Sequence, residues 1–287
     1  MTRTSRPSYL LGLVGEGIAA SLSPALHEQE GEECGIRISY RLIDTARLGL
    51  SHDDLPAILD WAERLGFDGL NITHPFKQAV LPLLDEVSVD AGDLGAVNTV
   101  LFRDGSRLGR NTDWAGFVEA FRTALPEAVG DRAVVVGTGG AGTAVGYGLL
   151  NLGAEHVAVL DTDPQRAQAC AGRLASRYGE DRVRPETDLA RALDDAHGVV
   201  NASPVGMHGH PGTAVPEDLL RQDLWVSDVV YFPLETELTR VARARGCRVV
   251  SGGGMAVHQA VGAFEHFTGR SPDIARMARH FAALTAS

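Results

Sequence analysis

The segment from Arg132 to Asp161 constrains the fold more than any other part of the chain. Its sequence, RAVVVGTGGAGTAVGYGLLNLGAEHVAVLD, predicts a strand, a glycine-rich turn, a helix, a second strand and a terminal carboxylate. Gly137, Gly139 and Gly142 form the pattern G-x-G-x-x-G, which allows a tight turn, a close backbone approach to a pyrophosphate and close helix packing. The helix N-terminus would offer free N–H groups to phosphates. The segment therefore predicts the first βαβ unit of a Rossmann nucleotide-binding domain.

Asp161 indicates which dinucleotide such a domain would bind. It lies 19 residues after Gly142 (161 − 142), where a carboxylate accepts hydrogen bonds from the adenosine ribose hydroxyls. The same charge would repel a 2′-phosphate, so we predict NAD rather than NADP. Two alternatives remain: a glycine turn without a ligand, and an S-adenosylmethionine-binding fold, which also has a glycine turn and an acid after its second strand.

Composition and charge exclude several classes of protein. The chain has 287 residues, enough for two domains, with 44% hydrophobic and 22% charged residues. A net charge of −11 argues against nucleic acid or an anionic membrane as a partner. The three cysteines, Cys34, Cys170 and Cys247, are far apart in the sequence, so we expect reduced thiols in a reducing compartment. We also expect no metal site, because the cysteines lack metal-ligand spacing and the pair His208 and His210 lies in a Gly/Pro loop. Because we find no signal peptide or membrane span, we expect a cytoplasmic protein. The oligomeric state stays open, a homodimer included.

The N-terminal part alternates strands and helices, which predicts an α/β domain with a mostly parallel sheet over residues 1–113. The predicted strands are 9–14, 39–43, 69–73 and 96–102, and the predicted helices are 24–33, 55–65 and a helix over 78–84.

The remainder predicts a doubly wound Rossmann domain over residues 114–254, so the fold class is α/β with two domains. Its predicted helices are 114–125, 164–178, 189–195 and 237–245, and its predicted strands are 133–136, 156–160, 198–201, 225–230 and 248–250. Two final helices, 255–268 and 272–284, are expected to return to the first domain, which residues 255–287 would complete.

Polar residues gather where these elements end, which is where α/β proteins bind ligands. Ser21 and Ser23 alternate in a segment expected to be extended, so both hydroxyls could hold one carboxylate. The competing interpretation, favoured by the pattern alone, is that Ser23 caps a helix with Pro24 at its first position.

Lys77 follows Asn71 and Thr73, which alternate on one strand face, and Pro75. A lysine in the first turn of a helix opposes the helix dipole, which would lower its pKa and suit it to exchange a proton with an alkoxide. An exposed surface lysine is the simpler interpretation. Asp113 could pair with Lys77 or cap the helix 114–125, and the amide of Asn98 could bind a hydroxyl or lie in a turn.

Taken in order, eight motifs resemble the shikimate dehydrogenase family over nearly the whole chain, and within it the quinate/shikimate dehydrogenase branch. They are S-x-S-P at 21–24, N-x-T-x-P-x-K at 71–77, G-A-x-N-T at 95–99, G-x-N-T-D at 109–113, the glycine loop at 137–142, N-A-S-P-x-G-M at 201–207, D-x-x-Y-x-P-x-x-T at 228–236 and M-x-x-x-Q-A at 255–260.

The resemblance implies a dehydrogenase of a small carbocyclic hydroxy acid, shikimate or quinate, that transfers a hydride to NAD. It implies that Ser21 and Ser23 hold the substrate carboxylate and that Lys77 and Asp113 are the catalytic pair, without deciding which is the formal base. It implies further substrate contacts from Thr73, Asn98, Asp113, Gln259 and Tyr231. For the cofactor it implies Gly137, Thr138, Gly139, Gly140, Ala141, Gly142, Asp161, Arg166, Asn201, Ser203, Met207 and Gly254.

The sequence that follows the predicted strand 156–160 differs from that of NADP-dependent family members, which usually have Asn-Arg-Thr at this place. This chain has Asp161-Thr-Asp163 and no arginine before Arg166, which again favours NAD. The substrate is expected in a cleft between the domains. An amino-substituted analogue as substrate, and a non-catalytic NAD-sensing protein, are the alternatives that the sequence leaves open.

Overall fold

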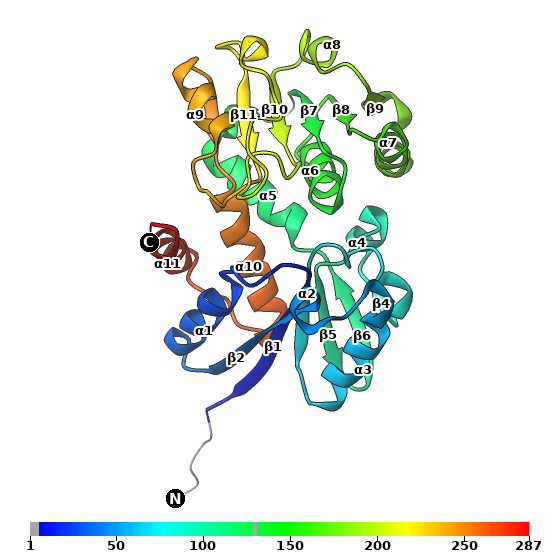
Figure 1. Ribbon diagram of the computed structural model, residues 1–287, viewed down its shortest axis with the longest axis vertical. Helices are drawn as coiled ribbons and strands as arrows, with labels where there is room; N and C mark the ends of the chain where they lie inside the picture. The colour runs from blue at the N-terminus through cyan, green and yellow to red at the C-terminus, as the bar shows by residue number, and fades with distance from the viewer. Residues whose placement is uncertain (1–5, 129–130, 287) are drawn as a thin grey trace, which may run out of the picture. The chain divides into compact units, whose positions relative to one another are not determined.

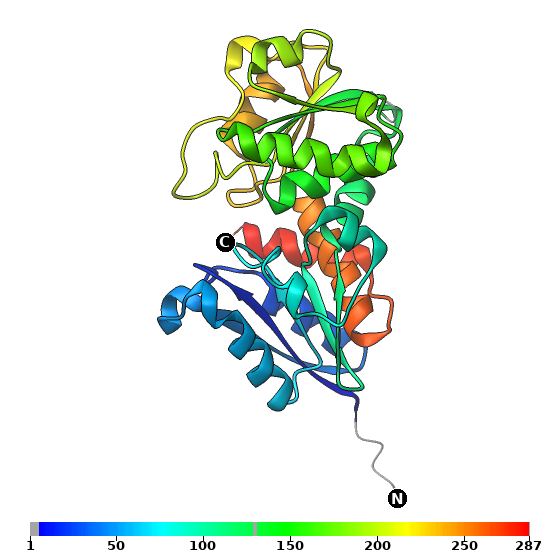
Figure 2. The ribbon, with the colours of Figure 1, turned by 90° about the vertical axis from the view of Figure 1, so that its right-hand side faces the viewer.

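The computed structural model describes residues 6–128 and 131–286 and divides them into two compact units (Figure 1). The first unit reaches Thr112 and resumes at Ala260, and the second comprises Asp113–Gln259. Each unit is built on a six-stranded, mostly parallel sheet with helices on both faces (Figure 2). The predicted α/β fold class is therefore confirmed.

The first sheet has the strand order β2-β1-β3-β5-β6-β4. β1 pairs in parallel with both β2 and β3, whereas β5 is antiparallel to β3 and β6. A tight turn with positive φ at Asp104 and Gly105 joins β5 to β6, as a two-residue hairpin requires. The strands are β1 (Ser8–Gly15), β2 (Arg37–Asp44), β3 (Gly69–Ile72), β4 (Glu86–Val87), β5 (Thr99–Arg103) and β6 (Ser106–Arg110).

Two apolar layers cover this sheet. On one face α3 (Leu55–Arg64) buries Leu59 against Leu70 and Phe76. On the other, Phe264 and Phe267 of α10 (Gly253–Thr268) pack with Leu11. The other helices of this unit are α1 (Ser23–Glu33), α2 (Thr45–Leu48), α4 (Val89–Leu94) and α11 (Ile274–Thr285), with short 3₁₀ turns at His52–Asp54 and Leu81–Leu83.

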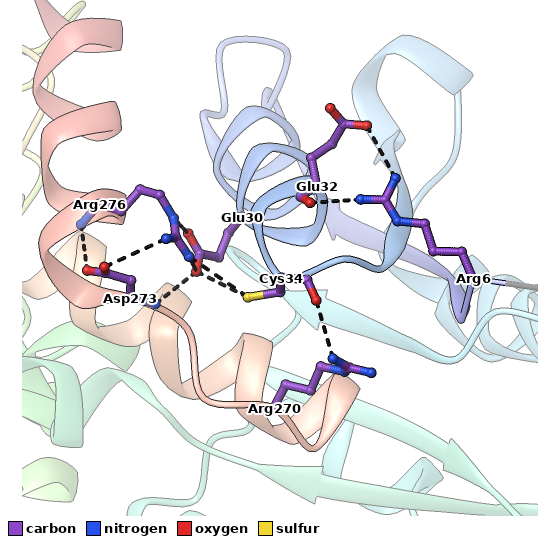
Figure 3. Close-up of polar contacts among 7 residues, drawn as sticks. All are labelled: Arg6, Glu30, Glu32, Cys34, Arg270, Asp273 and Arg276. Atoms are coloured by element: carbon purple, nitrogen blue, oxygen red, sulfur yellow. Dashed lines mark hydrogen bonds and ion pairs between the residues drawn. The ribbon is translucent and has the colours of Figure 1, made fainter.

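A buried carboxylate attaches the C-terminal helix α11 to α1 (Figure 3). Glu30 is 1% exposed, and it accepts hydrogen bonds from Arg276 Nε at 2.9 Å and from the Asp273 backbone N–H at 2.8 Å. Cys34, the residue directly after α1, donates its thiol to Glu30 at 3.4 Å. Because a buried charge needs a partner, this set fixes the position of α11 on the first unit.

The second sheet has the order β12-β11-β10-β7-β8-β9, and all of its pairs are parallel. The order reverses between β7 and β10, as in a doubly wound dinucleotide fold. The strands are β7 (Arg132–Val136), β8 (His156–Leu160), β9 (Val183–Glu186), β10 (Gly198–Asn201), β11 (Trp225–Asp228) and β12 (Arg248–Val250). Strands β4 and β6 of the first sheet and β9 of this one were not among the predicted strands.

Helices flank the second sheet on both faces. Leu193 and Leu238 bring α8 and α9 onto a core with Val199 and Val226, while Phe121 of α5 packs edge-on against Trp225. The helices are α5 (Asp113–Ala124), α6 (Gly140–Asn151), α7 (Pro164–Tyr178), α8 (Leu189–Leu193) and α9 (Glu237–Ala244), with 3₁₀ turns at Pro126–Ala128, Glu180–Arg182 and Glu217–Leu219. None of the helices in the described part of the chain is long and apolar enough to span a bilayer.

Candidate active site

The two hydroxyls predicted to hold a carboxylate do lie together, for a different reason from the one expected. Leu22 is helical rather than extended, and Ser23 is the first residue of α1. The N-cap position is Leu22, without a side-chain cap, so the prediction that Ser23 caps the helix is wrong. Instead Ser21 Oγ accepts the Ser23 backbone N–H at 3.3 Å and lies 3.2 Å from Ser23 Oγ. This turn places two hydroxyls side by side.

Lys77 lies in a run of turns after β3. No helix spans 78–84, and the only regular element there is the 3₁₀ turn Leu81–Leu83. The predicted helix is therefore wrong, and the dipole argument for the Lys77 pKa loses its basis. The Lys77 carbonyl accepts the Val97 N–H at 2.8 Å, so the backbone at Lys77 is held by a tertiary contact with the segment before β5.

Thr73 follows β3 directly, at the carboxyl end of the first sheet. Its backbone N–H bonds to the Val14 carbonyl at 2.9 Å, and a Cβ on Gly15 would overlap its methyl group. The loop after β1 and the loop after β3 therefore pack closely. Thr73 and Lys77 are four residues apart on this second loop.

Asn98 is the centre of a buried set of hydrogen bonds just before β5. Its Oδ1 accepts the Thr112 N–H at 2.9 Å and the Thr99 hydroxyl at 2.9 Å, and its Nδ2 donates to Thr112 Oγ1 at 2.8 Å. Asn98 is 3% exposed. These bonds fix the backbone immediately before Asp113, which is the first residue of α5. The cap interpretation placed Asp113 ahead of that helix, whereas the structure places it inside.

The glycine loop of the second unit has the shape that a pyrophosphate requires. Gly137 has φ +94°, and a Cβ there would lie 2.7 Å from the Ser203 nitrogen. A Cβ on Gly142 would overlap the Gly137 carbonyl. At Gly139, by contrast, a Cβ would meet only Arg166 Nη2 at 3.5 Å, so its backbone is open to close approach. Gly140 and Ala141 begin α6, with its N–H groups next to this opening.

The Asp161 carboxylate bonds to the same loop. Its Oδ2 accepts both the backbone N–H and the hydroxyl of Thr138 at 2.8 Å, and its Oδ1 accepts the Asp163 N–H at 3.1 Å. Partial burial raises the Asp161 pKa, but the bonds from Thr138 and Asp163 and the charge of Arg166 outweigh it and lower the pKa overall. Asp161 is therefore ionised at neutral pH, with Arg166 Nε 3.9 Å from Oδ2.

A second loop of this unit is organised by Asp228, the first residue of the motif at 228–236, for which no role was predicted. Asn201 Nδ2 donates to Asp228 Oδ1 at 2.9 Å, and Thr236 donates to Asp228 Oδ2 at 2.6 Å. Asn201 Oδ1 in turn accepts the Ser203 hydroxyl at 2.6 Å. Burial raises the Asp228 pKa against the opposing effect of these bonds. Asp228 thus fixes the loops that follow β10 and β11, on which Met207 and Tyr231 lie.

Met207 and Tyr231 are partly exposed, at 40% and 38%. Desolvation of its hydroxyl raises the Tyr231 pKa, and the negative charge of Asp113 raises it further. Gln259 lies on α10, with its Nε2 donating to the Ala256 carbonyl at 3.0 Å. Gly254 is in the first turn of that helix.

The predicted site residues are divided between the two units. Ser21, Ser23, Thr73, Lys77 and Asn98 belong to the first unit, and Asp113, Tyr231, Gln259 and all of the predicted cofactor residues belong to the second. No cluster of three or more metal-ligating side chains occurs among residues 6–128 and 131–286.

One signal in the sequence went unused. Lys77 is the sole lysine among 26 basic residues, all of the others being arginine. An arginine stays charged under all ordinary conditions, whereas a lysine can give up and recover a proton. Lys77 is therefore distinguished from the other basic residues by its chemistry as well as by its place in the motif.

The family-level comparisons agree with this arrangement. A model of the shikimate dehydrogenase substrate-binding domain matches residues 13–100, and one of the shikimate 5′-dehydrogenase C-terminal domain matches residues 252–280. Shikimate dehydrogenase (NADP(+)) of Streptomyces avermitilis is 52% identical over 98% of this chain and 97% of its own length. The chain belongs to the shikimate dehydrogenase family. This assignment contradicts the S-adenosylmethionine alternative.

Other relatives in this family carry the other nicotinamide dinucleotide. Quinate/shikimate dehydrogenase (NAD(+)) of Corynebacterium glutamicum is 50% identical over 96% of this chain and 99% of its own length. The crystal structure of quinate dehydrogenase from C. glutamicum in complex with NAD superposes with a TM-score of 0.89, at 49% identity, and covers 97% of this chain and all of that one. The family therefore implies nicotinamide-dependent oxidation and reduction, while similar relatives differ in the dinucleotide that they use.

Proposed function

We propose that this protein is an NAD-dependent dehydrogenase that interconverts shikimate and 3-dehydroshikimate, quinate and 3-dehydroquinate, or both. The observation that carries the proposal is the sole lysine, Lys77, within the family's N-x-T-x-P-x-K motif at the carboxyl end of the first sheet. The family relationship supports the reaction class, since the S. avermitilis relative is a shikimate dehydrogenase and the C. glutamicum relative a quinate/shikimate dehydrogenase.

The first unit supplies the groups that we propose for the acid. The adjacent hydroxyls of Ser21 and Ser23 suit the two oxygens of a carboxylate, because each can turn an O–H toward one of them. Thr73 and Asn98 are proposed to bind ring hydroxyls. From the second unit, Asp113, Gln259 and Tyr231 are proposed as further contacts.

The second unit supplies the groups that we propose for the dinucleotide. The open backbone at Gly139 and the N-terminus of α6 fit a pyrophosphate. Ionised Asp161 suits ribose hydroxyls and opposes a 2′-phosphate, which favours NAD. Asn201, Ser203, Met207 and Gly254 are proposed for the nicotinamide side, and Thr138 and Arg166 hold the adenosine side by their contacts with Asp161.

The proposed chemistry divides between cofactor and protein. When bound, a nicotinamide dinucleotide would supply the acceptor for the hydride that leaves the ring carbon. The hydroxyl on that carbon must lose its proton in the same step, and we assign this proton to Lys77 with Asp113 as its catalytic partner. We assign to the serines, Thr73 and Asn98 the role of holding the ring in one orientation, which lowers the entropic cost of reaching the reactive geometry.

The test is reduction of the dinucleotide by the purified protein in four combinations, shikimate or quinate with NAD or NADP. The matched variant is Asp161→Asn, which keeps the shape of the side chain and removes its charge. We expect a higher kcat/KM with NAD in the wild type and a smaller NAD preference in the variant. A preference for NADP in the wild type would overturn the cofactor assignment, and inactivity in all four combinations would overturn the function.

A further inference from the structure

A continuous chain of buried hydrogen bonds runs through the first unit and joins two groups proposed for the substrate. It begins at the serine pair and ends at Asn98 and Thr112, although these positions are far apart in the sequence. Its interior members are almost fully buried, with exposed fractions of 3% for Tyr40, 7% for Asn71 and 0% for Thr99. In sequence order the chain comprises Ser21, Ser23, Tyr40, Asn71, Asn98, Thr99 and Thr112.

The side-chain donors in this series of hydrogen bonds all point the same way, from Ser21 toward Thr112. The Asn98 backbone carbonyl determines this direction, because a carbonyl can only accept. Asn71 Nδ2 donates to the Asn98 backbone carbonyl at 3.2 Å and to Thr99 Oγ1 at 3.1 Å. The amide oxygen of Asn71 therefore faces Tyr40, whose hydroxyl must donate to it, at 2.8 Å. Thr99, having accepted from Asn71, donates to Asn98 Oδ1.

Tyr40 is the only member that links the serine pair to the two asparagines. Its hydroxyl gives its single proton to Asn71, so it can only accept from Ser23. Ser23 in turn accepts from Ser21. Burial raises the Tyr40 pKa far above its usual value, against the opposing hydrogen bond from Ser23, so the hydroxyl remains protonated at any working pH.

The Tyr40 ring is itself held in place. It stacks on His27 with the ring centroids 5.1 Å apart, and its backbone N–H donates to Glu28 Oε1 at 2.8 Å. The hydroxyl therefore has little freedom to follow Ser23. Ser23 and Asn71 must instead orient themselves toward the hydroxyl.

We propose that Tyr40 is a positioning residue for the acid substrate, whose one phenolic oxygen keeps the Asn71 amide in a fixed orientation and holds Ser23 Oγ in place until the acid binds. The inference rests on the proposed function. When a carboxylate arrives, Ser23 turns its O–H from Tyr40 to the ligand. Tyr40 continues to donate to Asn71, so the bonds around Asn98 stay unchanged during binding. Tyr40 thus aligns both ends of the acid without contacting it.

The variant Tyr40→Phe tests this role because it keeps the stacked ring and removes only the hydroxyl. We expect KM for the acid to rise about tenfold, since the buried Asn71 amide loses a partner and Ser23 Oγ is no longer held in place before the acid binds. We expect kcat and KM for the dinucleotide to change less than about twofold. The matched control is Tyr9→Phe, which removes a hydroxyl that donates to the Thr268 carbonyl at 3.2 Å, outside the chain.

A double-mutant cycle separates positioning from general destabilisation. If Tyr40 acts through Ser23, the combined variant Ser23→Ala/Tyr40→Phe should raise KM less than the product of the two single effects. Multiplicative effects would overturn the inference. So would an unchanged KM in Tyr40→Phe, or an equal rise in Tyr9→Phe, while the wild type remains active.

A substrate-free measurement completes the test. In ¹⁵N-edited NMR spectra, the side-chain amide signals of Asn71 and Asn98 should shift in Tyr40→Phe and remain in place in Tyr9→Phe. Unmoved signals would overturn the inference, whatever the activity. An inactive wild type whose signals do shift would overturn the proposed function and, with it, the role in substrate positioning, while leaving the hydrogen-bond chain itself established.

Discussion

At the scale of single residues, the most informative contacts belong to side chains that neighbouring groups hold in place. Asp161 is held by Thr138, Asn98 by Thr112, and Asn71 by Tyr40. A site that orients a polar ring needs this, because each group must already point in the right direction when the ligand binds. Lys77 differs from these groups because the sequence alone already sets it apart, as the sole lysine of the chain.

Two replacements of Lys77 distinguish a role of its positive charge in turnover from a role in proton transfer. Both Lys77→Met and Lys77→Arg should lower kcat by about 10²–10⁴-fold, because neither side chain can exchange a proton at neutral pH. Affinity for NAD, measured by titration calorimetry, should stay within about twofold. If Lys77→Arg retained most of the turnover, Lys77 would act through its charge alone, and the assignment of the proton to it would be wrong.

His27 should make the first unit sensitive to acid. Burial lowers the His27 pKa to about 4, and in the described structure its Nδ1 has no hydrogen-bond partner. In the unfolded chain the imidazole takes up its proton near pH 6.5, whereas the folded protein resists protonation until about pH 4. The stabilising contribution is therefore complete above about pH 6.5 and declines as the pH falls toward 4, by up to about 3 kcal/mol.

Urea unfolding at about pH 7.5 and pH 4.5 measures this effect. The variant His27→Phe should lose less stability between the two pH values than the wild type does. The matched control is His210→Gln, an exposed histidine whose replacement should leave the difference unchanged. An equal loss in His27→Phe and the wild type would show that His27 is not the group responsible.

At the scale of elements, hydrophobic periodicity predicted most of the strands and helices, and local chemistry could not predict the rest. The helix expected over 78–84 does not form, because Pro82 interrupts the segment and the Lys77 carbonyl bonds to Val97 instead of to a following turn. β9 was missed because its sequence, VRPE, is short and contains a proline. The first outcome depends on the contact with Val97, and β9 forms only by its pairing with β8.

Prediction from the sequence was limited in the same way for the candidate site. Motif and glycine spacing point to the serine pair, Lys77 and the glycine loop, whose roles stay predictions. Tyr40 could not be found in this way, because it lies on the interior face of β2 and looks like an ordinary apolar strand residue. Only the pairing of β2 with β1, and of β1 with β3, brings its hydroxyl to Asn71.

Close packing of β3 against α10 gives an element-scale prediction. A Cβ on Gly69 would overlap the Phe267 ring and approach the Val100 carbonyl at 2.7 Å, so Gly69→Ala should lower the free energy of unfolding by about 1–3 kcal/mol. Phe267→Leu in the same chain should recover part of this loss. Gly92→Ala in α4 meets open space and should be neutral or stabilising by up to about 1 kcal/mol. Equal destabilisation at both positions, measured by urea unfolding, would contradict the packing.

At the scale of the whole molecule, the chain combines two sheets of different construction. The first unit is built from both ends of the chain, since α11 is bound to α1 through Glu30 and Arg276. The second is a continuous doubly wound fold. The proposal assigns the acid mainly to the first unit and the dinucleotide to the second, so turnover requires residues from both.

The most direct test of this account is to follow the transferred hydrogen. The substrate is shikimate carrying deuterium on the carbon of the reacting hydroxyl, incubated with the wild-type protein and NAD in ordinary water. We predict that NMR of the reduced cofactor will show the deuterium at nicotinamide C4, and that the Lys77→Met variant will transfer it far more slowly. Deuterium released to the solvent, or no reduced cofactor with either shikimate or quinate, would contradict the account.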